Sequence, residues 1–511
     1  MRSFFVCVGL AAGGCASNVS LSGDGGTVTG TLALTVAPVS VTAAGKTFSS
    51  STQFALQWTA VNAHHFEARA TSAAGSTVVV RFDSAATQGI ANQLAAATEY
   101  TVTLAACADE ACASSPTATG VGKTGEEVWQ IQGSGEAYAT ATKVITDGNT
   151  LSYAFRYGSE AGALAGYTRY YYNPSFGGGS GFGPGVRPAK STSAGADLAS
   201  VSTFVASDSG IKGPCDDKHL ADCPKSGALF MRASQGVPLK RGGVRMFFEA
   251  EDLNSASHTP RHYFLDSQDG YLGEDFNPLS TSTVCGGNGS TDYQATGACA
   301  PTLTIGLQGD STLGDSGLIA ARQAKIGYPT RTSWLWDEAP GTFQVITGAD
   351  ACKKSPDGLF YATWDGLRWN TVKDSGGCAR LFVAGAHGPV IVHLGEGRYK
   401  LYFEHRPQGG TPGPQANKPL HMVYADATRT GDPNVVDFDD WELETASREV
   451  HFLWPTGKQL DEAEESGLGD HFVYAPDSLA SQFMYVNLGG FDNLSTPTTS
   501  QGIGIAVLLN P

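Results

Sequence analysis

The sequence has little charge, fewer basic than acidic residues and no long apolar run. Only 16% of its 511 residues are charged, and the formal net charge is −16. A nucleic-acid partner requires clustered Lys and Arg that replace counterions, so this balance argues against nucleic-acid binding. No stretch approaches the roughly 20 apolar residues of a membrane-spanning helix. We therefore expect neither a nucleic-acid partner nor a helix that crosses a membrane.

Several catalytic and metal-binding motifs are also missing. There is no His-Glu-x-x-His and no Gly-x-Ser-x-Gly, so zinc proteases and serine hydrolases with a nucleophile elbow have no support. The 11 histidines are scattered without metal-ligand spacing, and no cofactor is expected. Structural calcium is the one alternative, at Asp266, Asp269 and Glu274, although these residues lack the full alternating-acid pattern.

The sequence is instead rich in turns and short apolar strands. It has 64 glycines, 10% aromatic and 41% hydrophobic residues, and almost no helical periodicity. This composition is typical of a turn-dense all-β protein that buries large cores. The length fits two domains.

The N-terminus has the pattern of a targeting signal. Arg2 precedes an apolar run, and small residues lead into Cys15. The pattern resembles a bacterial lipoprotein signal, which implies that residues 1–15 are a signal peptide and that Cys15 carries the lipid that anchors the protein to the outer membrane. An ordinary cleaved signal, followed by secretion, is the alternative. Residues 16–28 are rich in Ser and Gly and are expected to form a flexible tether.

Residues 29–124 contain short alternating strands at regular spacing, which predicts a β-sandwich. Trp58 lies early in this domain and Tyr100 on a late strand. They resemble the core tryptophan and corner tyrosine of fibronectin type III domains. Such domains in bacterial surface proteins are usually spacers and sometimes binders.

Residues 125–511 repeat a different module, made of apolar and aromatic strands with acidic turns. The units cover residues 128–173, 228–270, 358–369, 388–441 and 474–510. Five antiparallel units predict a five-bladed β-propeller. The fold class is therefore expected to be all-β, with a fibronectin type III-like sandwich followed by this propeller.

The last unit resembles a blade of the five-bladed propellers of glycoside hydrolase family 43, which begins Trp-Ala-Pro-Asp and ends Ile-Gly-Val-Ala. The corresponding residues here are Tyr474-Ala-Pro-Asp477 and Gly502-Ile-Gly-Ile-Ala506. The turn Thr363-Trp-Asp-Gly-Leu-Arg-Trp369 is similar to a closure shared with families 32 and 130. The resemblance implies that Asp477 orients the general acid and tunes its pKa.

Cleavage of a glycosidic bond requires one protonated and one ionised carboxyl group, about 5–10 Å apart. The inner strands of a propeller converge on its axis, so carboxylates from different blades can meet there. The candidate catalytic residues are Asp477, Glu404 and Glu249. The candidate substrate-binding residues are Arg232, His387, His471 and Tyr474. The alternatives are solvated side chains on middle strands for the two glutamates and a turn cap for the aspartate.

Eight cysteines follow Cys15, and they fall into four sequential pairs. Short loops closed in this way are typical of disulfides in an oxidising compartment. A metal site has little support, because no pair has the two-residue spacing of a zinc knuckle. The predicted disulfides join Cys107 with Cys112, Cys215 with Cys223, Cys285 with Cys299, and Cys352 with Cys378.

The sequence therefore predicts a bacterial surface lipoprotein whose propeller acts on carbohydrate as a glycosidase-like domain. The alternative is a non-catalytic propeller that binds glycan or protein at the cell surface. The first unit offers Glu136 and Tyr138 where the family has an Asp-Pro base, which leaves both hypotheses open. A purely structural envelope protein is a third, weaker possibility.

Overall fold

The chain is nearly all β in its computed structural model. The structure describes residues 14–18, 30–43, 45–112, 115–146, 148–156, 167–174, 187–191, 204–206, 229–238, 244–252, 261–266, 283–284, 332–335, 343–348, 358–364, 369–376, 380–395, 397–405, 420–426, 436–442, 448–461, 468–474, 483–488 and 502–511. The helical segments in these ranges are two 3-10 turns, η1 (Tyr138–Thr140) and η6 (Phe438–Asp440). No helix in these ranges is long and apolar enough to cross a membrane.

The N-terminal domain is one eight-stranded sheet in the order β5-β4-β7-β8-β1-β2-β3-β6. Its strands are β1 (Gly14–Asn18), β2 (Thr31–Ala43), β3 (Lys46–Trp58), β4 (His65–Ser72), β5 (Thr77–Asp83), β6 (Gln88–Ala91), β7 (Glu99–Cys107) and β8 (Thr117–Lys123). The strand β1 contains Cys15 and also residues 16–18 of the predicted tether. These three residues are paired with β2.

Buried aromatic side chains organise the core of this domain. Trp58 and Tyr100 are 5% and 1% exposed, as their predicted core roles require. The hydroxyl of Tyr100 accepts a hydrogen bond of 2.7 Å from the backbone N–H of Ala95, which ties the approach to β7 to the strand itself. The predicted disulfide between Cys107 and Cys112 is present. The fibronectin type III assignment stays a prediction.

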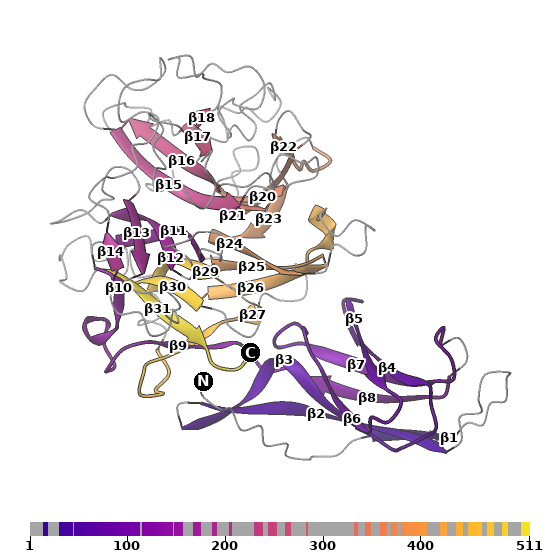
Figure 1. The fold of residues 1–511 in the computed structure, drawn as a ribbon. Coiled ribbons are helices and arrows are strands. Elements are labelled where there is room, and N and C mark those ends of the chain that lie inside the picture. Colours follow the sequence, from indigo (N-terminus) through magenta and orange to yellow (C-terminus); the bar gives the residue numbers. More distant parts are fainter. Residues whose placement is uncertain are drawn as a thin grey trace.

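The remaining strands form five further sheets in a propeller-like arrangement (Figure 1). Four sheets are each built from one contiguous segment. They comprise β11 (Gly148–Arg156), β12 (Thr168–Pro174), β13 (Arg187–Ser191) and β14 (Phe204–Ala206); β15 (Leu229–Pro238), β16 (Val244–Asp252), β17 (Arg261–Asp266) and β18 (Thr283–Val284); β19 (Thr332–Leu335), β20 (Phe343–Gly348), β21 (Gly358–Trp364), β22 (Trp369–Thr371) and β23 (Leu381–Ala384); and β24 (Ala386–Gly395), β25 (Arg398–His405), β26 (Leu420–Asp426) and β27 (Arg448–Glu449).

The last sheet is a composite of both ends of residues 125–511. Its strands are β9 (Val128–Ile131), β10 (Lys143–Ile145), β28 (His451–Leu453), β29 (Leu468–Tyr474), β30 (Phe483–Leu488) and β31 (Gly502–Leu508). The early strand β9 lies between β28 and β31, as Figure 1 shows by its purple colour among yellow strands. The prediction of five repeats in sequence is therefore corrected. Four blades are contiguous, and the predicted unit 128–173 is divided because β9 pairs with the C-terminal strand.

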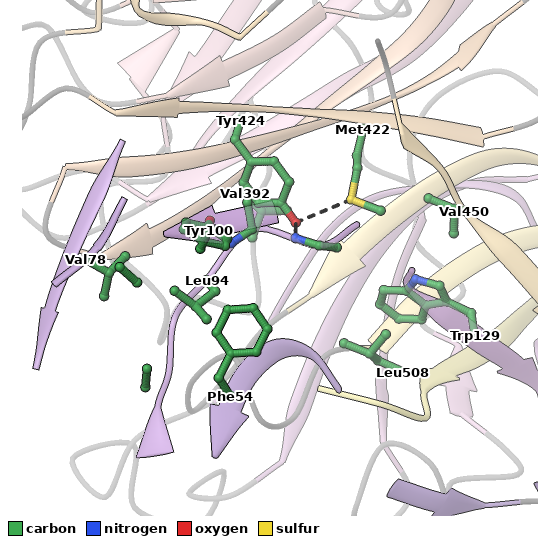
Figure 2. Packing of buried hydrophobic residues seen from close by; sticks show 14 of the residues in the cluster. Phe54, Val78, Leu94, Tyr100, Trp129, Val392, Met422, Tyr424, Val450 and Leu508 are labelled. Atoms are coloured by element: carbon green, nitrogen blue, oxygen red, sulfur yellow. Dashed lines mark hydrogen bonds between the residues drawn. The ribbon is translucent and has the colours of Figure 1, made fainter. Parts of the chain in front are cut away.

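The N-terminal domain and the propeller are joined by hydrogen bonds around Asn510. Its side-chain amide donates to the carbonyls of Ser49 and Glu126 at 2.8 and 2.7 Å, and its oxygen accepts from the N–H of Val128 at 3.0 Å. Apolar side chains from both domains pack into one continuous cluster beside it (Figure 2). The two domains therefore form one packed body.

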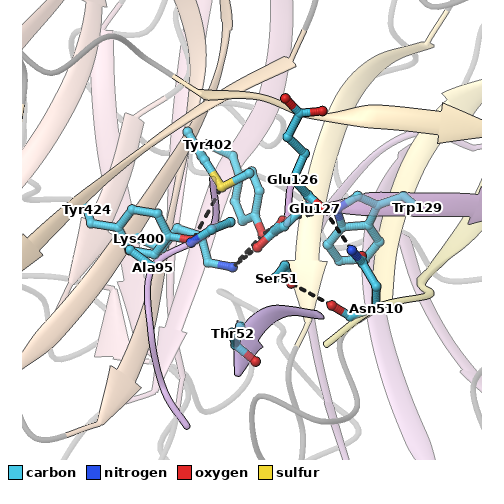
Figure 3. A network of polar contacts seen from close by, with 12 residues as sticks. Ser51, Thr52, Ala95, Glu126, Glu127, Trp129, Lys400, Tyr402, Tyr424 and Asn510 are labelled. Carbon is cyan, nitrogen blue, oxygen red and sulfur yellow. Dashed lines mark hydrogen bonds and ion pairs between the residues drawn. The ribbon is translucent and has the colours of Figure 1, made fainter. Parts of the chain in front are cut away.

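A buried ion pair lies where the chain enters the propeller. Lys400 on β25 contacts Glu127 at 2.5 Å, and these side chains are 1% and 0% exposed (Figure 3). Tyr402 donates to the same carboxylate at 2.7 Å, and Trp129 donates to it at 3.1 Å. Burial and the neighbouring Glu127 charge raise the pKa of Tyr402 well above its ordinary value. Because these charged groups are fully buried, we interpret their network as one that stabilises the fold and does not bind a ligand.

We predict that Lys400→Met destabilises the protein by about 3–5 kcal/mol, because it leaves the Glu127 carboxylate buried without its counter-charge. Urea unfolding followed by tryptophan fluorescence measures the loss. Removing the charge of Glu127 as well, in Lys400→Met with Glu127→Gln, should restore much of the stability.

The matched control is Lys458→Met, whose partner Glu136 lies 3.6 Å away in an exposed pair. Such pairs contribute at most about 1 kcal/mol. Equal losses for the two single variants would contradict the structural role of the buried pair.

Candidate functional site

The innermost strands of the sheets contact one another in a closed ring. The strand β11 contacts β15, β15 contacts β19, β19 contacts β24, β24 contacts β29, and β29 contacts β11. Each inner strand opens an antiparallel meander, so the inner strands run in the same direction and begin at the same end of the ring. We call this the start end. Four predicted binding residues lie on inner strands: Arg232 on β15, His387 on β24, and His471 and Tyr474 on β29.

The two candidate glutamates lie at equivalent positions of two blades. Each is on the second strand, directly opposite a predicted binding residue of the inner strand. Glu249 on β16 is the Cα partner of Arg232, and Glu404 on β25 is the Cα partner of His387. Both pairs lie near the start end, because they involve the first half of the inner strand and the last part of the second strand. The sheet register thus places each carboxylate position beside a basic one.

Not all candidates are at the start end. Tyr474 is the last residue of β29. The strand begins at Leu468, and at about 3.3 Å per residue its two ends are about 20 Å apart. Asp477 lies outside the described residues, as do Asp269 and Glu274 of the calcium alternative and the last six cysteines.

Glu404 is half-buried at the end of a strand whose two faces bury different cores. Side chains alternate along a strand, so Glu404 shares a face with Tyr402, and Phe403 lies on the opposite face. Tyr402 belongs to the large cluster that includes the composite sheet. Phe403 belongs to the cluster shared with the preceding blade. Glu404 is therefore on the face of its blade that is directed toward the composite sheet.

Two histidines near Glu404 were not predicted from the sequence. The rings of His405 and His421 are 4.9 Å apart, and the His421 ring stacks on Phe403 at 6.1 Å. Burial lowers the pKa of His405, against a smaller opposite effect from its hydrogen bond to the carbonyl of Ala384. The sequence signal that could have drawn attention to His405 is its position directly after Glu404, at the end of an aromatic strand. Both rings lie on the Phe403 face of the sheet, opposite to Glu404, because His405 is two residues from Phe403 and His421 is the Cα partner of Phe403.

Glu136 and Tyr138 are not on the inner ring. Glu136 accepts a hydrogen bond of 2.6 Å from Thr456, and this bond lowers the pKa of its carboxyl group. Tyr138 packs against Trp454 at 5.3 Å between ring centroids. Both residues follow β9, which is three strands away from β29 in its sheet. The Glu136 carboxylate, which follows β9, is thus distant from the inner strands.

In the described part of the chain, groups of three potential metal ligands occur only in the N-terminal domain, around His65. The described residues of the ring contain no such group.

No protein-family model matches the chain, and no curated protein matches it. Among solved structures, a glycosyl hydrolase from Bacteroides ovatus is 13% identical over 71% of this chain and 84% of its own, with a TM-score of 0.37. The alpha-L-arabinofuranosidase PaAbf62A from Podospora anserina is 10% identical over 76% and 97%, with a TM-score of 0.36. An exo-inulinase from Aspergillus awamori is 11% identical over 72% and 63%, with a TM-score of 0.39. The fold described above rests on strand pairing and not on these likenesses.

We predict that His405→Gln reduces the sensitivity of the fold to acid. Because burial lowers the folded-state pKa of His405, the unfolded chain binds a proton at higher pH than the folded chain does. Stability is thus lost as the pH falls from about 6.5 toward the lowered pKa. Urea midpoints at about pH 7.5 and about pH 5 should differ less in the variant than in the wild type. An unchanged difference would contradict this role of His405.

Proposed function

We propose that residues 125–511 act on carbohydrate as a glycosidase-like propeller. The observation that carries the proposal is the repeated register at the start end of the ring. There, Glu249 lies opposite Arg232 and Glu404 lies opposite His387. Glycoside cleavage needs two carboxyl groups about 5–10 Å apart, and this register supplies one carboxylate position from each of two blades whose inner strands belong to the same ring.

Each residue has a proposed role. Glu404 and Glu249 supply the acid and base, since cleavage of a glycosidic bond requires one protonated and one ionised carboxyl group. Arg232, His387 and His471 bind sugar hydroxyls. Asp477 is assigned to tuning the acid by the resemblance to family 43 alone. Tyr474, three residues before it, ends β29 about 20 Å from the start end and is not part of the proposed acid-base site.

The second candidate function is glycan or protein binding without turnover. It is favoured by the position of Glu136, which follows β9, accepts a hydrogen bond from Thr456 after β28, and is three strands away from the inner strand β29. The same ring residues would then bind a cell-surface ligand through hydrogen bonds alone.

The two functions are separated by turnover on a panel of glycans. If the propeller is an enzyme, Glu404→Gln and Asp477→Asn should each lower turnover by roughly 10²–10⁴-fold, because acid-base catalysis or its tuning is lost. Sugar binding, measured by calorimetry, should persist in both variants. The control is Glu449→Gln, an exposed glutamate on the outer strand of the same blade as Glu404.

Wild-type binding without turnover on any glycan would establish the binding module instead. Turnover that is lost equally in Glu449→Gln would contradict the placement of the site at the start end.

We also propose that the protein is a lipoprotein of the cell envelope, anchored to the outer membrane through Cys15. The support is the order of a basic residue, an apolar run and small residues before that cysteine. If Cys15 carries lipid, labelled palmitate should enter the wild-type protein and be absent from Cys15→Ser. Release of unlabelled wild-type protein into the medium would show ordinary secretion.

A further inference from the structure

A cluster of two histidines and a carboxylate lies in the N-terminal domain, away from the inner ring. His64 immediately precedes β4 and His65 begins it, and Glu110 lies in the loop after β7. The Nδ1 atoms of the two imidazoles are 3.2 Å apart. The Nδ1 atom of His64 is 3.9 Å from a carboxylate oxygen of Glu110. One ligand atom from each of the three residues lies within 4.8 Å of the other two.

These separations match the edges of a metal coordination shell. Zinc binds imidazole nitrogen and carboxylate oxygen at about 2.0–2.2 Å, so neighbouring ligands in a tetrahedral site are about 3.3–3.6 Å apart. The observed 3.2 and 3.9 Å bracket this value. Two imidazoles and one carboxylate suit Zn²⁺, Cu²⁺ or Ni²⁺ better than Ca²⁺ or Mg²⁺, which prefer all-oxygen sites.

The backbone holds the three ligands in place before any ion arrives. The N–H of His64 donates to the carbonyl of Cys107 at 2.7 Å, which joins the histidine pair to the end of β7. The disulfide between Cys107 and Cys112 closes the loop that carries Glu110. Asp109 accepts a hydrogen bond from the N–H of Cys112 within the same loop.

Arg81 is the cation that now contacts this cluster. It forms two hydrogen bonds to Glu110, at 2.7 and 2.6 Å, and its Nη2 also lies 3.1 Å from Nδ1 of His65. A guanidinium can only donate, so Nδ1 of His65 is the acceptor in this contact and carries the lone pair that a metal ligand requires. The Arg81 side chain is 47% exposed and can move into water when an ion enters.

We propose that His64, His65 and Glu110 form a binding site for a divalent transition-metal ion, with Arg81 as the group that the ion displaces. The ion replaces the contacts of Arg81 with Glu110 and His65 by three ligand bonds, and water completes the coordination. This site is independent of the carbohydrate function, because none of its residues belongs to the propeller.

Zn²⁺ titration of tag-free, disulfide-intact full-length protein by calorimetry tests the site. His64→Ala should weaken binding by at least the roughly tenfold that loss of even an outer-shell partner costs, and Glu110→Gln should also weaken it. Arg81→Ala should tighten binding by about two- to fivefold, because an exposed ion pair no longer competes. The same variants should change the visible absorption of bound Co²⁺ in parallel.

The matched control is His451→Ala. This histidine also faces a glutamate, Glu126, at 3.1 Å, but within the described part of the chain it belongs to no group of three potential metal ligands. His451→Ala should bind Zn²⁺ like the wild type. The proposal is overturned if wild-type protein binds no Zn²⁺ or Co²⁺, if His64→Ala and His451→Ala weaken binding equally, or if Arg81→Ala weakens it. Because His64 and Glu110 are largely exposed, at 54% and 72%, circular dichroism should show both variants folded.

Discussion

Closure of the propeller by strands from both ends of residues 125–511 is the constraint on which the other contacts depend. The strand β9 pairs with β31, so the sheet that completes the ring cannot form until the chain is almost complete. Asn510 then bonds the end of the chain to β9 and to Ser49 of the first domain. The buried pair of Glu127 and Lys400 lies beside the same junction. One closure therefore fixes the ring and also docks the N-terminal domain on it.

The ring in turn determines what the candidate site can be. Five inner strands that contact in a circle bring Arg232, His387 and His471 to one assembly although they are far apart in the sequence. The middle strands place Glu249 and Glu404 beside two of them. The ring leaves Glu136 outside, because β9 is three strands away from the inner strand β29 in the composite sheet. The acid-base pair that we propose therefore comes from the blades of β16 and β25 and not from the first predicted unit.

The two polar clusters that the fold creates differ in their exposure to solvent. Glu127 and Lys400 are withdrawn from solvent and satisfied by Tyr402 and Trp129, so they stabilise the junction and have no access to a ligand. Glu110 and His64 have similar chemistry but remain exposed on a loop and a strand start. An exposed ion pair contributes little to stability. Its groups can therefore exchange their present partner for a metal ion at a small energetic cost.

The sequence by itself determined the features that depend on neighbouring residues. Alternating apolar residues specified the strands around Trp58 and Tyr100, and a separation of five residues was enough to predict the Cys107–Cys112 disulfide. Tyrosine and tryptophan at these positions also indicated a buried core, because a half-buried strand needs a large apolar side chain on one face. Tertiary structure decided the rest. Three features depend on residues that are distant in the sequence. They are the pairing of β9 with β31, the contact between Glu127 and Lys400, and the approach of His64 to Glu110. The side-chain pattern of a strand is local, but its partner is chosen by closure of the whole sheet.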